Sequence, residues 1–193
     1  MRLHTLLAIA LAVSSPIVGA TSKKGPGIYA ECFEQAARHY HVDVGLYMTI
    51  VEGESSFQPG AIHHNKDGST DYGMAQINSS LFPALARYGI SRDDVINNVC
   101  LNIHLGAWVL HEAIRKYGYT WRAVGAYGAG WGKKRERARG VYANRVALRY
   151  YSKKQIVSKN SQKLTGFDNP LNKSKEEEIS SPETSHTPKM KVY

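Results

Sequence analysis

The chain has 193 residues, of which 42% are hydrophobic, and a formal net charge of +9. This length allows one domain of ordinary size with terminal extensions, and the hydrophobic fraction excludes a chain too polar to build a core. The positive charge suits an anionic polymer or a membrane surface as partner.

Residues 1–20 have the pattern of a secretory signal peptide. Arg2 precedes an apolar run from Leu6 to Val13, and small residues lead up to Ala20. Because the run is too short to span a bilayer, we expect cleavage after Ala20 and export to the periplasm or cell envelope. A retained membrane anchor is the alternative; after cleavage no stable transmembrane segment is expected. Export makes nucleic acid a poor partner and an acidic cell wall a better one.

The exported part contains two cysteines, Cys32 and Cys100. In an oxidising compartment an isolated pair most simply forms one disulfide, the alternative being two unpaired buried thiols. The bond would close a loop of roughly 70 residues and stabilise the fold by about 4 kcal/mol on the chain-entropy estimate. Neither cysteine has a metal-ligand spacing, so zinc and catalytic thiol roles are not expected.

The first part of the exported chain predicts two helices. Residues 21–27 read as a flexible polar leader containing glycine and proline. Apolar residues recur at helical spacing over residues 28–40. Asp43 is a suitable N-cap for a second helix, which Pro59 and Gly60 prevent from continuing.

Glu54 is the candidate working residue of this second helix. It follows Leu46 and Ile50 at intervals of four and so continues their apolar face, whereas Glu52 lies roughly 160° away around the axis. A carboxylate on a buried face is costly unless it has a role or a partner. The alternative for Glu54 is a surface ion pair at the end of the helix.

A small β element and a central helix are predicted next. The dipeptide Asp67-Gly68 predicts a tight hairpin within residues 61–76. Short helices should follow over residues 79–96, broken at Gly89 and capped at Ser91. The clearest helix covers residues 97–117 and is apolar enough to be central.

The C-terminal part predicts two more helices and a tail. One helix begins near Thr120 and leads into AYGAG at 126–130, and after the basic segment 133–139 another covers residues 141–151. From Ser152 to the end, polar composition predicts a disordered tail, because too little apolar surface is available to fold alone.

No metal or cofactor site is expected. His63, His64 and Asp67 resemble metal ligands but lie in one loop with no second cluster. The same loop fails as a calcium site because neither its first nor its twelfth position is acidic.

Three motifs in order give the chain a family resemblance: ESSF at 54–57, GMAQI at 73–77 and AYGAG at 126–130. Together they resemble the lysozyme-like lytic transglycosylases of the SLT domain family, above all the small exported enzymes that accompany bacterial secretion, conjugation and pilus machines. The resemblance covers about residues 30–150. It implies an α+β, predominantly helical, lysozyme-like fold with a small β element and a substrate cleft, placed in a domain of residues 28–151.

The resemblance also implies roles for single residues. Glu54 matches the catalytic acid, and substrate-binding positions fall on Ser55, Gln76 and Tyr127. The alternative for Gln76 is to satisfy buried backbone groups, and Tyr127 could instead bond to Glu54 or pack in the core. Tyr142 is a further candidate for the cleft lining, with core packing as its alternative. Two positions depart from the family pattern. Ala75 in place of Met implies the loss of an apolar wall under a sugar ring, and Gly128 in place of Asn the loss of an amide near the cleft.

Asp71 has several candidate roles. The segment DGSTDYG also resembles animal-type lysozymes, in which an Asp follows the catalytic Glu at the spacing of Asp71 from Glu54. Asp71 could stabilise an oxocarbenium-like transition state or act as nucleophile of a retaining hydrolase. Its alternative is to hold the loop through hydrogen bonds. We expect a supporting role.

The implied chemistry is cleavage of peptidoglycan glycan strands. A protonated Glu54 would protonate the glycosidic oxygen between N-acetylmuramic acid and N-acetylglucosamine, and then act as base on the 6-hydroxyl to give a 1,6-anhydro sugar. The resemblance implies local opening of the wall for a secretion, conjugation or pilus apparatus. The alternatives are a hydrolase that uses Asp71, and a weakly active peptidoglycan-binding scaffold subunit.

Overall fold

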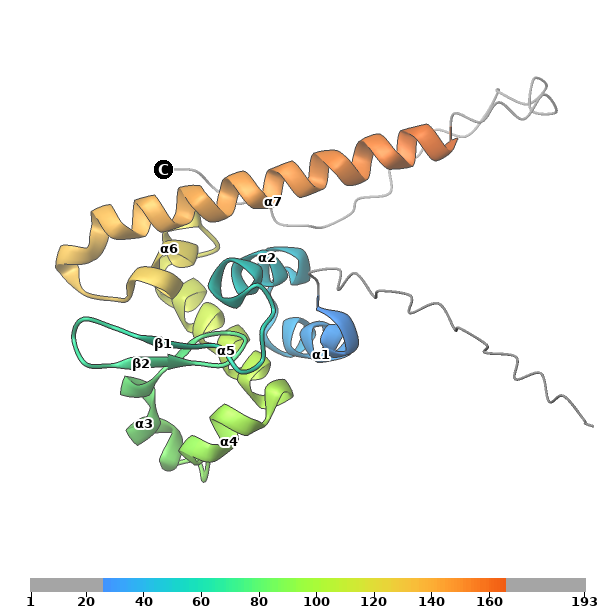
Figure 1. The fold of residues 1–193 in the computed structure, drawn as a ribbon. Coiled ribbons are helices and arrows are strands. Elements are labelled where there is room, and N and C mark those ends of the chain that lie inside the picture. The colour runs from blue at the N-terminus through green and yellow to red at the C-terminus, as the bar shows by residue number, and fades with distance from the viewer. Residues whose placement is uncertain (1–25, 166–193) are drawn as a thin grey trace, which may run out of the picture.

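The computed structural model describes residues 26–165. These residues form a mostly helical structure with one small three-stranded antiparallel sheet (Figure 1), which confirms the predicted fold class. The predicted signal peptide, residues 1–20, lies outside the described residues, and the domain boundaries stay a prediction. The elements in chain order are η1 (Gly27–Tyr29), α1 (Ala30–Tyr40), α2 (Val44–Ser55), β1 (Ile62–His64), β2 (Thr70–Tyr72), β3 (Ile77–Asn78), η2 (Ser79–Leu81), α3 (Phe82–Ala86), α4 (Arg92–Asn97), α5 (Val99–Tyr117), α6 (Trp121–Ala129), η3 (Lys133–Arg135) and α7 (Glu136–Thr165).

Local side-chain caps explain where two of the helices begin. Asp43 caps α2 as predicted, since its Oδ1 accepts a hydrogen bond from the Leu46 amide at 2.6 Å. Ser91 caps α4 in a reciprocal capping box with Asp94. Each cap satisfies backbone N–H groups that have no partner inside the helix.

Helix α5 is the centre of the core. Ile103, Ala107 and Leu110 on this helix have no exposed surface. Helices α1, α4 and α6 pack around it, and β3 also contacts it. The apolar pattern of residues 97–117 therefore predicted both the helix and its central position.

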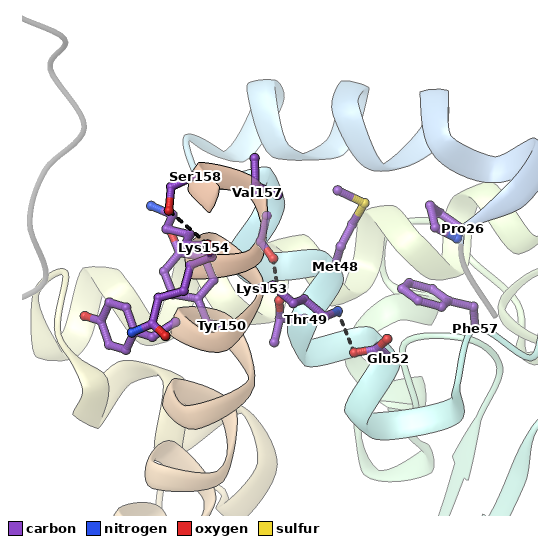
Figure 2. Close-up of a pocket in the computed structure, with 13 residues that line it drawn as sticks. Pro26, Met48, Thr49, Glu52, Phe57, Tyr150, Lys153, Lys154, Val157 and Ser158 are labelled. Atoms are coloured by element: carbon purple, nitrogen blue, oxygen red, sulfur yellow. Dashed lines mark hydrogen bonds and ion pairs between the residues drawn. The ribbon is translucent and has the colours of Figure 1, made fainter. Parts of the chain in front are cut away.

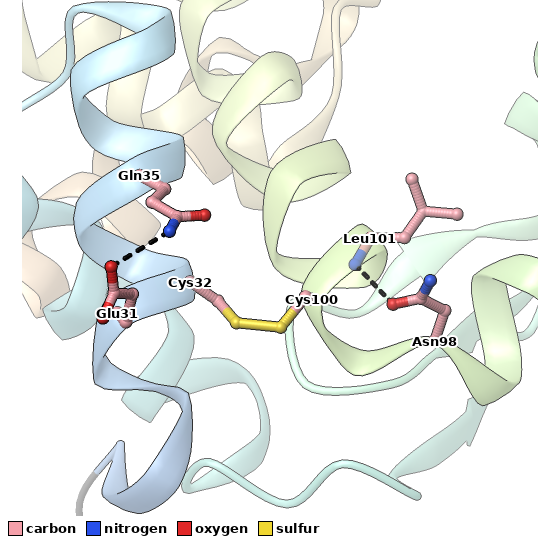
Figure 3. The surroundings of a disulfide bond; sticks show 6 residues. All are labelled: Glu31, Cys32, Gln35, Asn98, Cys100 and Leu101. Carbon is pink, nitrogen blue, oxygen red and sulfur yellow. Dashed lines mark hydrogen bonds between the residues drawn. A yellow bond between two sulfur atoms is a disulfide. The ribbon is translucent and has the colours of Figure 1, made fainter.

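The predicted disulfide between Cys32 and Cys100 is present. Figure 3 shows it joining α1 to the first turn of α5, where the two Cα atoms are 5.4 Å apart. The loop that it closes contains all of α2 and the sheet. The covalent bond therefore anchors the segment that carries Glu54 and Asp71 to the central helix.

The sheet places Asp71 in its middle strand. Strand β2 pairs with β1 on one side and with β3 on the other, and Asp71 lies opposite both His63 and Asn78. After β2 the chain turns at Gly73, whose φ of +76° favours glycine. The buried side chain of Asn102 on α5 fixes this turn by donating to the Tyr72 carbonyl at 2.9 Å and accepting from the Ala75 amide at 2.8 Å.

Helix α7 is longer than the helix that the sequence predicted for the C-terminal part. It runs from Glu136 to Thr165 and so continues well beyond Ser152, where the sequence predicted a disordered tail. Extending an existing helix adds one hydrogen bond per residue without a new nucleation cost, so a polar exposed segment can remain helical. Lys153 also bonds to Glu52 on α2 at 2.6 Å. Residues 166–193 lie outside the described residues.

Figure 1 shows α7 running along one side of the molecule over α6 and α2, with the β1–β2 hairpin, α3 and α4 on the other side. Residues on α7 are thereby brought to α2, far away in the sequence. Across residues 26–165, no helix combines the length and apolar character needed to cross a membrane.

Candidate active site

A cleft of about 540 Å³ brings together most of the predicted site residues. Glu54, Asp71, Gln76 and Tyr127 line it, whereas Ser55 and Tyr142 are not part of its surface. The sheet and its loops supply one wall, and the C-terminal end of α6 with the following loop supplies another. The other residues that line it are Asn65, Asp67, Ser69, Ile77, Asn78, Ser80, Leu81, Val109, Gly128, Ala129, Gly130, Trp131, Gly132 and Arg135.

Glu54 lies in the last turn of α2 with a partly buried side chain. Burial raises the pKa of its carboxyl group above the ordinary value. A hydrogen bond from Tyr142 and the positive charges of Arg145 and Arg149 lower the pKa, and the negative charge of Asp71 raises it. Because burial is the largest of these effects, Glu54 holds its proton to a higher pH than an exposed glutamate. This property suits a general acid.

Tyr142 is the hydroxyl partner of Glu54. It comes from α7, is 8% exposed, and its hydroxyl donates a hydrogen bond to Oε1 of Glu54. The sequence offered Tyr127 for this role, but the Tyr127 hydroxyl donates to the Ala75 carbonyl at 2.7 Å. Tyr142 is thus a hydrogen-bond partner of Glu54 and does not line the cleft. Contact of either tyrosine with substrate stays a prediction.

Gly128 makes room for Tyr142. A Cβ atom at residue 128 would lie 2.0 Å from Cε2 of the Tyr142 ring, which is far closer than real atoms approach. From the sequence, Gly128 implied the loss of an amide near the cleft. The structure adds a second consequence, because the absent side chain lets the Tyr142 ring pack against α6 and reach Glu54.

Asp71 is held in place by two amide side chains. Its Oδ1 accepts from Nδ2 of Asn78 at 2.7 Å, and its Oδ2 accepts from Nδ2 of Asn65 at 2.9 Å. Each of its two carboxylate oxygens therefore has an N–H donor that fixes its position. The arrangement therefore presents a fixed negative charge to the cleft that also contains Glu54.

Ser55 and Gln76 hold the loop that follows β2. The Ser55 hydroxyl donates to the Met74 carbonyl at 2.7 Å. Nε2 of Gln76 donates to the carbonyls of Gly73 at 2.8 Å and Ala61 at 3.2 Å. These bonds tie α2 and the sheet to one loop geometry. Substrate contacts of the two side chains stay a prediction.

The position of Ala75 differs from the one that the sequence suggested. The sequence suggested that this residue stands under a sugar ring, where it replaces a larger apolar wall. In the structure Ala75 has no exposed surface, and its methyl group packs against Gly106 of α5 closely enough that a Cβ at residue 106 would lie 2.5 Å away. Ala75 therefore belongs to the core and not to the cleft.

Glu52 faces a different part of the molecule from Glu54, as the helical phase predicted. Figure 2 shows the Glu52 carboxylate bonded to Lys153 in a second cavity, of about 900 Å³, between α2 and α7. Its walls are mainly apolar, with Met48, Phe57 and Val157 among them. Glu54 does not line this cavity, so the two acidic side chains lie on opposite faces of α2.

Sequence reasoning missed two residues of the site region. Asn102 lies in an apolar stretch with no motif to mark it, although a polar residue on a buried helix face is itself a signal. Trp131 follows the AYGAG segment and is exposed at the cleft, which an aromatic residue between two glycines could have indicated. Within residues 26–165, no group of three or more His, Cys, Asp or Glu side chains could hold a metal ion.

Sequence comparisons place these features among known proteins. The model of the family described as the transglycosylase SLT domain matches residues 31–148. Invasion protein IagB from Salmonella typhimurium is 38% identical over 135 residues, which cover 70% of this chain and 84% of that protein. Protein IpgF from Shigella flexneri is 38% identical over 121 residues, covering 63% and 80%. X polypeptide from Escherichia coli is 39% identical over 119 residues, covering 61% and 70%.

A solved structure has the same fold. It is the X-ray structure of an inactive mutant of lytic transglycosylase Slt from Pseudomonas aeruginosa, with a TM-score of 0.51 and 22% sequence identity. The match covers 64% of this chain and 23% of that one. The likeness shows the lysozyme-like fold that the motifs implied.

Proposed function

Because the chain belongs to the transglycosylase SLT domain family, we propose that it is a peptidoglycan lytic transglycosylase. The proposed reaction cleaves the β-1,4 bond between N-acetylmuramic acid and N-acetylglucosamine and leaves a 1,6-anhydro end. The observation that carries it is the partly buried Glu54, bonded to Tyr142 and open to the cleft.

The reaction begins with the protonated Glu54. Its proton passes to the glycosidic oxygen, the bond from this oxygen to the anomeric carbon breaks, and positive charge develops on the muramic acid ring. The acetamido oxygen of the same sugar and the fixed negative charge of Asp71 stabilise this cation. The 6-hydroxyl then bonds to the anomeric carbon and gives its proton to the Glu54 carboxylate. Glu54 ends protonated, ready for another cycle.

The hydrogen bond from Tyr142 assists Glu54 both when it acts as acid and when it acts as base. A donor on Oε1 orients the carboxyl group and stabilises it after it has lost its proton. Burial works in the opposite direction and keeps the proton in place before the reaction. The balance of the two effects lets a single residue serve as acid and then as base.

A hydrolase that uses Asp71 is the second candidate, favoured by the fixed carboxylate in the cleft. In that reaction water attacks the anomeric carbon and the product is a reducing sugar. The binding-scaffold candidate has less support. Ala75 lies in the core, and Gly128 accommodates the tyrosine that holds the acid, so neither departure by itself indicates a weakened site.

The proposed biological role is local opening of the cell wall for an envelope-spanning apparatus of the secretion, conjugation or pilus type. Its support is the similarity to a relative named invasion protein and the family's lytic transglycosylase activity. The role requires export, which the predicted signal peptide at residues 1–20 would provide.

Digestion of purified sacculi tests the function. The protein without residues 1–20 is incubated with sacculi, and the soluble fragments are separated and identified by mass spectrometry. Anhydro fragments support the transglycosylase, and reducing fragments alone would replace it by the hydrolase. If nothing is released although the protein binds sacculi, the scaffold candidate is correct.

A further inference from the structure

We propose that Trp131 forms a further sugar-binding subsite of the cleft, in which its indole ring stacks against a ring of the glycan strand. The inference rests on the proposed function and adds to it a residue that contacts substrate without taking part in the proton transfers.

The exposure of Trp131 is the first observation. Its side chain is 38% exposed, and among residues 26–165 it is the one exposed large hydrophobic side chain that lines the cleft containing Glu54. Leaving so large an apolar group in water forgoes the stabilisation that burial would give. Exposed apolar groups at a concave, otherwise polar surface commonly mark a binding site.

Two side chains of α5 pack against the indole. The ring of Tyr117 stacks on it, with centroids 6.2 Å apart and an angle of 22° between the planes. Nζ of Lys116 lies 5.4 Å from the Trp131 ring centre and 5.6 Å from that of Tyr117. Trp131 is therefore part of a packed stack and keeps its position while part of the ring remains open to the cleft.

The backbone around Trp131 is also fixed, by a buried arginine. Arg139 is 2% exposed, and its Nη1 donates to the carbonyls of Gly130 at 2.8 Å and Gly132 at 3.0 Å. Its other nitrogen atoms donate to Glu136. A buried guanidinium is costly unless its donors are used. Here two of its hydrogen bonds hold the residues on either side of Trp131.

An indole ring that is held in place on a fixed loop can bind the face of a sugar ring. The face of an indole is electronegative, and the C–H groups on the face of a pyranose ring carry small positive charges. Because side chain and loop are held before binding, little conformational entropy is lost when the sugar arrives. The ligand class is a β-1,4-linked chain of N-acetylated amino sugars, which has the repeating rings that the cleft needs.

Calorimetric titration with a soluble chitooligosaccharide tests the subsite. The parent protein carries Glu54→Gln to prevent turnover, and Trp131→Ala and Trp131→Phe are added to it. We expect about tenfold weaker binding for Trp131→Ala, the size of one aromatic stacking contact, and a smaller loss for Trp131→Phe. The matched control is Tyr88→Ala, which removes an 82% exposed aromatic side chain outside the cleft and should leave affinity unchanged.

Unchanged affinity in the folded Trp131→Ala protein would overturn the inference, as would a parent protein that binds no oligosaccharide. Circular dichroism melts establish that each variant is folded, and Trp131→Phe provides the comparison if the alanine variant is unstable. The proposed function is measured separately by sacculus digestion with Glu54 intact. If wild-type protein releases no fragments while Trp131→Ala still weakens binding, the subsite stands and the enzymatic proposal fails.

Discussion

The hydroxyl group of Tyr142 donates a hydrogen bond to Glu54, although the two residues are 88 positions apart in the chain. Helix α7 brings the tyrosine over the end of α2, and Gly128 of α6 leaves the space that its ring needs. The catalytic proposal thus depends on three helices. The bond also acts on the acid, because it lowers the pKa of Glu54 against the larger effect of burial.

Tyr142→Phe should move the alkaline limit of activity to higher pH. The transglycosylase reaction needs protonated Glu54, so activity falls as pH rises through the pKa of this group. Removing a donor that stabilises the carboxylate raises the pKa further. We also expect a loss of rate at the original optimum of roughly 10- to 10²-fold, since a hydrogen bond to a charged group is worth about 1.5–3 kcal/mol. A pH profile of fragment release measures both effects, and an unchanged profile would show that the bond has no part in catalysis.

Gly128→Ala should have the same effect as Tyr142→Phe, by displacing the ring. The added Cβ would lie 2.0 Å from the Tyr142 ring, so one of them must move. If displacement of the tyrosine is the cause, Gly128→Ala combined with Tyr142→Phe should be no less active than the worse single variant. Gly60→Ala is the control, because a Cβ there meets nothing within 4 Å. Additive losses in the double variant would contradict the proposed link.

Asp71→Asn should shift the pH profile in the opposite direction. The charge of Asp71 raises the pKa of Glu54, so its removal lowers the alkaline limit. The rate should fall by on the order of 10²-fold, as for loss of one electrostatic group at a reacting centre, while the remaining product stays anhydro. Complete loss of activity in a protein with unchanged melting temperature would instead favour Asp71 as the nucleophile of a hydrolase.

The sequence predicted the local features of this site better than the tertiary ones. Helical phase separated Glu54 from Glu52, and the two acids do lie on opposite faces of α2. The sequence offered Tyr127 as one possible partner of Glu54 and did not indicate Tyr142 for this bond, because the order of residues along the chain does not say which turn of α7 lies over α2. Ala75 was misplaced for the same reason, since burial against Gly106 arises only when the loop packs on α5.

Composition alone also could not give the extent of α7. Residues 152–161 are polar for the most part and exposed, but a helix begun by buried residues such as Val146 can continue into a polar segment. Contacts such as the Lys153–Glu52 ion pair depend on that continuation. The caps at Asp43 and Ser91 were predictable because they involve neighbouring residues only.

The most direct test of the central proposal compares Glu54→Gln with Glu52→Gln in the digestion of purified sacculi. Glutamine keeps the shape of either side chain but cannot transfer the proton. We expect Glu54→Gln to lower the release of anhydro fragments by at least about 10²-fold, the contribution of a general acid and base. Glu52→Gln, which removes only the partner of Lys153, should retain activity close to that of the wild type. Normal release of anhydro fragments by a folded Glu54→Gln protein would contradict the assignment of Glu54 as the catalytic acid.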